Sequence, residues 1–90
     1  MKIKQINSIL RRAAADNSLN ATDLRVIMFF AGGGSQVVNA KQRDIGEALG
    51  IARAQISRSM TALQELGYLL RVRNGVYSLV GDNDEEHNHQ

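Results

Sequence analysis

The segment between residues 42 and 69 constrains the fold of this chain more strongly than any other part of its sequence. Its sequence is QRDIGEALGIARAQISRSMTALQELGYL, with apolar residues at helical spacing before and after Gly50 and a further glycine at position 67. This pattern predicts two short helices joined by a tight turn, with a strand following Gly67. In the second helix, over residues 53–66, the apolar residues fall on one face and leave polar residues on the other. The polar residues on that face are Arg53, Gln55, Ser57 and Arg58.

Two further helices are predicted before this segment. Residues 3–15 have isoleucine, leucine and alanine at helical spacing, which predicts an amphipathic helix with basic residues on its other faces. Asn20 can accept hydrogen bonds from free amides and Asp23 suits the positive first turn, so a helix is expected from there to about Ala31. Three glycines within residues 32–35 predict its end in a flexible connector, without the features of a phosphate-binding loop.

A very short strand is predicted at residues 36–39. Asn39 and Gln42 have the spacing of a capping box, so the next helix is expected to begin at Ala40. The predicted helix-turn-helix unit therefore occupies residues 40–66.

The last folded element is predicted to be a β-hairpin. Runs rich in β-branched and aromatic residues, 68–73 and 76–80, flank Asn74 and Gly75, which both tolerate positive φ. Strand alternation over residues 70–73 places two arginines on one face, opposite a leucine and a valine. The expected fold is thus mainly α with a small β-hairpin, in the α+β class.

The charge of the chain is distributed unevenly. Its eleven lysine and arginine residues all lie at or before Arg73, whereas four of its nine acidic residues lie in the last ten positions. Residues 1–80, expected to form a single domain, therefore carry eleven basic and five acidic side chains, a formal charge of +6, and residues 81–90 carry −4. The basic excess favours binding of a polyanion. The acidic residues 81–90 are expected to form a disordered tail that either competes for the basic surface or only aids solubility.

Several classes of function are disfavoured by the sequence. The chain has no cysteine, and its two histidines, His87 and His89, lie in the tail without partner ligands, so no disulfide or metal site is expected. No set of residues suited to nucleophilic or acid–base catalysis is evident, so we expect no enzyme activity and no cofactor. The longest apolar run, residues 26–31, is too short to span a bilayer, and no signal-peptide core follows Met1. We therefore expect a cytoplasmic protein with no membrane partner and no small-molecule ligand.

The segment over residues 45–70 resembles the winged helix-turn-helix of bacterial transcriptional regulators of the MarR-like family. The shared features are Leu-Gly-Ile at the turn, Ile-Ser-Arg in the second helix and Leu-Gly-Tyr-Leu at the entry to the strand. The resemblance covers about residues 19–80, and it implies a winged helix-turn-helix fold with the wing at residues 68–80. Residues 1–18 would be an additional helix and a possible dimerisation element. Winged helices also serve as protein-docking and RNA-binding modules.

The resemblance further implies which residues meet the partner. The groove-facing positions of its recognition helix match Arg53, Ala54, Gln55, Ser57 and Arg58, and its wing matches Arg71, Arg73, Asn74 and Gly75. Lys41, Gln42 and Arg43 open the first helix of the motif, where contact with phosphate is common. The family usually has serine or threonine before the recognition helix, and this chain has Ala52, so the side-chain cap is missing. The amides left free there are hypothesised to meet a phosphate.

The residue types suit the recognition of DNA, since arginine can make two hydrogen bonds to guanine and glutamine two to adenine. The expected function is sequence-specific binding of double-stranded DNA by a small transcriptional regulator, a repressor acting by occupying DNA. The helix over residues 53–66 would enter the major groove, and the hairpin over residues 71–77 would lie on the flanking backbone or minor groove. A homodimer is expected, since winged-helix regulators generally bind palindromic sites. Two alternatives stay open: a plasmid or phage replication or copy-control protein, and a winged-helix module that docks on a protein without binding DNA.

Overall fold

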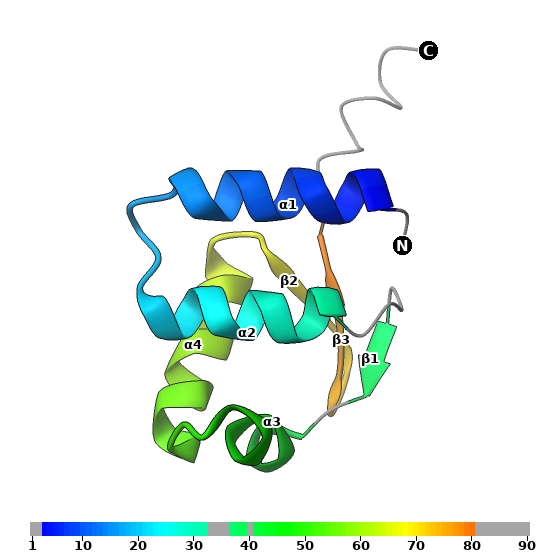
Figure 1. Ribbon diagram of the computed structural model, residues 1–90. Helices are drawn as coiled ribbons and strands as arrows, with labels where there is room; N and C mark the ends of the chain where they lie inside the picture. The colour runs from blue at the N-terminus through cyan, green and yellow to red at the C-terminus, as the bar shows by residue number, and fades with distance from the viewer. Residues whose placement is uncertain (1–2, 33–36, 40, 81–90) are drawn as a thin grey trace.

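In the computed structural model, which describes residues 3–32, 37–39 and 41–80, four helices pack on a small antiparallel sheet (Figure 1). The elements in chain order are α1 (Ile3–Ala15), α2 (Ala21–Gly32), β1 (Val37–Asn39), α3 (Gln42–Leu49), α4 (Arg53–Glu65), β2 (Leu69–Arg73) and β3 (Val76–Leu79). The prediction of a mainly helical α+β chain with a small hairpin is confirmed. The acidic tail expected to be disordered, and most of the expected connector after α2, lie outside the described residues.

The core is formed by the facing sides of the four helices together with one side of the sheet, and α3 contributes Ile45 to it. The amphipathic helix predicted at the N-terminus is confirmed as α1, which buries Ile9 and Ala13 against α2. Val26, Ile27 and Phe30 of α2 are at most 1% exposed and lie in the same cluster. The apolar side of α1 therefore covers the core of its own chain, and pairing of α1 with a second copy stays a prediction.

Two reciprocal hydrogen bonds close the start of α2. The Asp23 amide donates to Asn20 Oδ1 over 2.8 Å, and the Asn20 amide donates to Asp23 Oδ2 over 3.0 Å. This is a capping box, which satisfies two backbone donors that the helix itself leaves free. The predicted capping role of Asn20 is confirmed, and Asp23 takes part in it directly.

The turn between α3 and α4 is tight because two glycines allow it. Gly50 has φ 68°, the left-handed conformation that suits glycine, and its amide bonds to Gly46 O. The Ile51 amide also donates to Gly46 O, over 2.9 Å. A Cβ on Gly46 would lie 2.7 Å from Ile51 O, so the turn closes directly against this glycine. The predicted tight turn between the two helices is confirmed, with Gly50 as the C-cap of α3.

The predicted start of this helix is wrong. Helix α3 begins at Gln42, with Lys41 as its N-cap and no side-chain cap hydrogen bond. Asn39, the expected cap, is the last residue of β1 and pairs with Val76 of β3. Because strand pairing holds Asn39 in β1 and Lys41 takes the N-cap position, the helix begins two residues later than predicted. The two helices together span residues 42–65 instead of 40–66.

The sheet has the strand order β1-β3-β2, and both pairings are antiparallel. The predicted hairpin is confirmed as β2 and β3, and β1 adds a strand on the other side of β3. Gly67 ends α4 with φ 86°, and Gly75 at the hairpin tip has φ 79°. Asn74 has no positive φ, so only one of the two predicted tip residues adopts this conformation.

The β2–β3 pairing is irregular next to the hairpin tip. Arg71 pairs with Tyr77, whereas Arg73 pairs with Val76, so Val72 is an extra residue between the two pairs. Such a bulge bends a strand and increases its twist. The simple alternation predicted for this strand is therefore interrupted between the two arginines.

Candidate functional site

Helix α4 has a clear buried side and a clear open side. Ile56, Met60 and Leu63 are fully buried, as their spacing predicted. The opposite side of the helix is a row of exposed residues at spacings of four, three and four, which we call the α4 ridge. It consists of Ala54, Arg58, Thr61 and Glu65. Thr61 and Glu65 were not among the predicted contacts, although the same helical spacing could have identified them.

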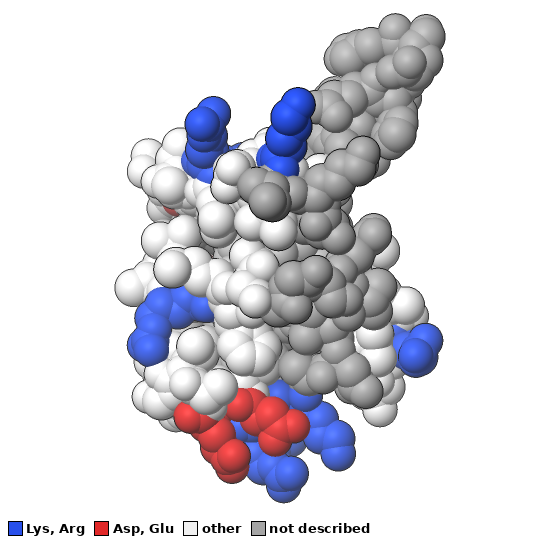
Figure 2. Space-filling view, turned by 45° about the vertical axis from the view of Figure 1, so that its right-hand side comes forward, with Lys and Arg blue, Asp and Glu red and all other residues white. Residues whose placement is uncertain are grey.

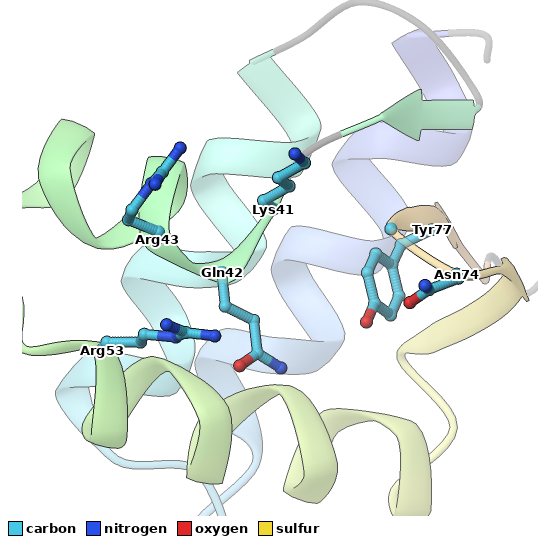
Figure 3. A pocket seen from close by; sticks show the side chains of 7 residues that line it. Lys41, Gln42, Arg43, Arg53, Asn74 and Tyr77 are labelled. Carbon is cyan, nitrogen blue, oxygen red and sulfur yellow. The ribbon is translucent and has the colours of Figure 1, made fainter.

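The first residues of α3 and α4 and the tip of the hairpin meet around one hollow of about 460 Å³, the hairpin-side hollow. Its lining residues are Lys41, Gln42, Arg43, Arg53, Asn74, Gly75 and Tyr77. Figure 3 shows the Arg53 and Tyr77 side chains reaching toward Gln42 from opposite sides, while Lys41 and Arg43 extend from the rim. The structure thus brings together six residues from three separate groups of predicted contacts: residues 41–43 of the first helix, Arg53 of the second helix, and residues 74–75 of the wing.

The hairpin-side hollow is basic. Three of its seven described lining residues are lysine or arginine, and none is acidic. The carboxylate nearest to these residues in sequence is that of Asp44, and its Oδ1 lies 3.8 Å from Arg43 Nε. The Arg43 side chain is 66% exposed and the Asp44 side chain 56%. An ion pair this exposed is weak and competes little with an incoming anion.

Tyr77 is a lining residue that the sequence did not reveal. It lies in β3, a strand whose residues are all buried, and is itself only 7% exposed. It stands in a run rich in β-branched and aromatic residues, and its ring contacts Phe30 edge-on, with the ring centroids 6.1 Å apart. Its hydroxyl end nevertheless reaches the hollow, as Figure 3 shows.

Two predicted contact residues of α4 lie on a different side of the helix. Gln55 and Arg58 line a second hollow of about 320 Å³, between α4 and the start of α2. The other lining residues of this α2-side hollow are Ser18, Asn20, Thr22, Asp23, Ser59 and Ala62. The structure therefore separates the predicted set. Arg53 lies on the hairpin side and Gln55 on the α2 side, while Ala54 and Arg58 lie on the α4 ridge, with Arg58 also lining the α2-side hollow. Ser57 is half-buried and lines neither hollow.

The predicted hairpin arginines are both exposed, and neither lines the hairpin-side hollow. Arg71 Nη2 lies 3.5 Å from Asn74 Oδ1, so this arginine reaches the hairpin tip. Leu70 and Val72, on the same strand, are 58% and 47% exposed. The outer strand of the hairpin thus combines two cations with two uncovered apolar side chains.

Both helix starts beside the hairpin-side hollow lack side-chain caps. Ala52 is the N-cap of α4 and makes no side-chain hydrogen bond, as the sequence predicted, and Lys41 makes none at the start of α3. Ala52 O accepts hydrogen bonds from the amides of Gln55 and Ile56. The free amides and the helix dipole add positive potential to that of the three cations.

A separate cluster positions the hairpin relative to the helices. The Arg12 guanidinium lies 4.2 Å from the centroid of the Tyr68 ring, and Arg12 Nη2 also donates to Gly67 O over 3.4 Å. The Tyr68 hydroxyl donates to Asp16 Oδ2 over 2.8 Å. Burial and the bond to Asp16 raise the pKa of the Tyr68 phenol. The Ser18 amide and then the Tyr68 hydroxyl lower the pKa of the Asp16 carboxyl.

No group of three or more histidine, cysteine or acidic side chains in the described part of the chain is arranged to hold a metal ion. No described helix has both the length and the apolar content needed to cross a membrane.

The chain was also compared with known proteins. It matches no protein-family model, no curated protein and no solved structure.

Proposed function

We propose that this protein binds double-stranded DNA as a winged helix-turn-helix protein, with α4 in the major groove and the β2–β3 hairpin on the flanking backbone. The observation that supports this best is the hairpin-side hollow, where the starts of α3 and α4 meet the hairpin tip. A basic concave surface shared by two helix starts and a hairpin suits a curved, uniformly anionic partner such as a DNA strand.

The shape of α4 is compatible with insertion into a groove. A major groove is about 12 Å wide and admits an α-helix. Ala54 and Thr61 on the α4 ridge are small, which lets the helix axis approach the bases closely. Glu65 lies at the far end of the same ridge and would be repelled by phosphates. This charge difference favours entry of the helix by its N-terminal end, where Arg53 lies.

The division of side chains on α4 suggests separate roles. Gln55 and Arg58 lie on the α2 side and are suited to base edges, since glutamine can pair with adenine and arginine with guanine. Arg53, with Lys41 and Arg43 on the hairpin side, is suited to the phosphates of one strand. Phosphate contacts of this kind fix the register of the helix, and the base contacts supply the specificity.

The biological role we propose is that of a small transcriptional regulator acting as a repressor by occupying its site as a homodimer. The same chemistry would serve a replication or copy-control protein of a plasmid or phage. These roles differ in the DNA that is bound, so the sequence and symmetry of the bound site would distinguish them.

Selection of bound fragments from a random pool of duplex DNA tests the proposal. We expect an enriched motif, with two-fold symmetry if the protein binds as a dimer. Arg58→Ala should then cost about 1–3 kcal/mol of binding free energy on that motif and relax the preference at one base pair. Arg11→Ala, which removes an exposed arginine from α1, is the matched control and should change binding little. Absence of enrichment above an unselected pool would contradict DNA binding.

One observation favours a second candidate, a module that docks on another protein. Strand β2 lies at the edge of the described sheet and exposes Leu70 and Val72. An exposed edge strand with apolar side chains can pair with an extended peptide. In that case Leu70→Ser would abolish partner capture, whereas substitution of Arg53, Gln55 and Arg58 would leave it unchanged.

A further inference from the structure

Helix α1 has a basic side that the proposed DNA contacts do not use. The helix contains no acidic residue, and Lys4, Asn7, Ser8 and Arg11 recur at spacings of three, one and three along its outer side. These four residues, the α1 stripe, line a hollow of about 500 Å³ together with Arg12. In Figure 1, α1 lies at the opposite end of the molecule from α3. Figure 2 shows basic side chains projecting from that end, separate from a group at the base.

The two terminal cations of the α1 stripe have no acidic partner in the described part of the chain. Lys4 and Arg11 are exposed, and neither forms an ion pair with a described residue. Asp16, the acidic residue nearest to α1 in sequence, is already bonded to the Ser18 amide and the Tyr68 hydroxyl. The positive charge of the stripe is therefore uncompensated within the described residues.

The described chain ends beside this helix. The Val80 amide donates to Tyr68 O over 2.8 Å, and the Tyr68 ring lies under the Arg12 guanidinium. In Figure 1 the end of β3 lies behind α1, in agreement with these contacts. Val80, the last described residue, is thus linked through Tyr68 to Arg12, which lines the same hollow as the α1 stripe. Residues 81–90, which carry four acidic side chains, follow it in the sequence.

The spacing of the charges is also matched. Lys4 and Arg11 are seven residues apart, which is about 10 Å along a helix. The acidic residues of the tail are Asp82, Asp84, Glu85 and Glu86. An extended segment over residues 82–86 spans about 13–14 Å, enough to meet both cations at once. Because the tail is tethered, its effective concentration at the stripe is on the order of millimolar, so even a weak contact is populated.

We propose that the acidic tail docks on the α1 stripe of its own chain, with its carboxylates at Lys4 and Arg11. Asn7 lies between the two cations and offers an amide donor to the same carboxylates. The contact neutralises the positive charge at the α1 end and leaves the α3–α4 end as the basic pole of the molecule. It does not depend on DNA binding, so it can hold even if the proposed function fails.

A spin label in the tail tests this docking directly. The chain has no cysteine, so Asn88→Cys gives a single attachment point for a nitroxide in the full-length protein. At low ionic strength we expect the backbone amides of residues 4–11 to be broadened more strongly than those of α3 and α4. The effect should vanish in about 1 M NaCl, where the Debye length is about 3 Å.

Matched charge reversals locate the binding surface. Lys4→Glu combined with Arg11→Glu should remove the broadening of α1, whereas Arg53→Glu combined with Arg58→Glu should leave it intact. If the first pair disturbs folding, judged by amide shifts outside α1, Lys4→Gln with Arg11→Gln provides the same test with a smaller change.

Four results would overturn the proposal. Broadening of α3 and α4 in place of α1 would mean that the tail covers the other basic face. No broadening anywhere would mean that the tail stays in solvent. Transfer of the effect from labelled protein to unlabelled, isotope-enriched protein would indicate a second copy as the occupant. If a DNA duplex shifted the α1 amides equally with and without residues 82–90, the stripe would belong to nucleic acid.

Discussion

The Tyr68 hydroxyl donates a 2.8 Å hydrogen bond to Asp16, joining the end of α1 to the start of β2 across 52 positions of sequence. The Tyr68 ring is 1% exposed and lies under the Arg12 guanidinium. This single side chain therefore connects the N-terminal helix to the strand that leads into the hairpin.

Tyr68→Phe keeps the ring and removes the hydroxyl, so it should lower the free energy of unfolding by about 1 kcal/mol, the usual net value of a hydrogen bond. Urea denaturation followed by circular dichroism measures the loss. Tyr77→Phe is the matched control, because no hydrogen bond joins the Tyr77 hydroxyl to another described residue. Equal losses in the two variants would show that the bond to Asp16 contributes nothing.

Acidification should weaken the same junction. The pKa of Asp16 is lowered in the folded protein by the Ser18 amide first and the Tyr68 hydroxyl second. Its contribution to stability is therefore present above the ordinary carboxyl pKa of 3.8 and is lost as the pH falls through the lower folded value. Urea midpoints between about pH 5 and pH 2 should converge for the wild type and Asp16→Asn. A constant difference over that range would contradict this assignment.

Gly46→Ala should destabilise the α3–α4 turn by about 1–3 kcal/mol, the usual range for overpacking. The added Cβ would lie 2.7 Å from Ile51 O, a backbone atom that moves only if the turn moves. Thermal unfolding measures the change. Gly32→Ala is the control, since nothing lies within 4 Å of the Cβ position there. If both alanines were tolerated alike, the close approach at Gly46 would not limit this turn.

Arg73→Ala should weaken binding to all DNA sequences alike, because the hairpin is proposed to meet the backbone. The slope of log K against log salt should become shallower by about 0.9 for one lost phosphate contact. Fluorescence anisotropy with a specific and an unrelated duplex at several salt concentrations measures both quantities. An unchanged slope would remove Arg73 from the proposed interface.

Ala52→Ser separates stability from binding at the start of α4. Position 52 has the extended backbone of an N-cap, with φ −61° and ψ 141°, so the serine hydroxyl can bond to a free amide and stabilise the protein by about 0.5–2 kcal/mol. If those amides bind a DNA phosphate, the same substitution should lower affinity. A variant that is more stable and binds DNA equally well or better would contradict phosphate binding at this helix start.

Local patterns predicted most of the elements. Periodicity and glycines located α1, α4 and the hairpin to within a residue or two, because these signals act between near neighbours in sequence. The prediction failed at Asn39, where a plausible capping box competed with strand pairing to Val76. That pairing joins residues far apart in the chain, so a pattern of neighbouring residues cannot predict it.

The candidate site was predictable as a list of residues but not as an arrangement. Helical spacing indicated that Arg53 and Arg58 are exposed. It could not show that they line different hollows, because that depends on the packing of the hairpin and α2 on either side of α4. Tyr77 was missed because its sequence context is that of a core strand residue. It reaches the hollow only because the hairpin meets the starts of α3 and α4 there.

The pairing of Asn39 with Val76 has a consequence for how the molecule opens. The β1–β3 ladder closes a loop over residues 40–75 that contains α3, α4 and β2, so both ends of this loop are fixed at one seam of backbone hydrogen bonds. Because α3 and α4 both lie within this loop, we expect fluctuations that break the seam to loosen the two helices together. Amide hydrogen exchange in α3 and α4 should therefore share a single opening free energy with β3, as one cooperative unit.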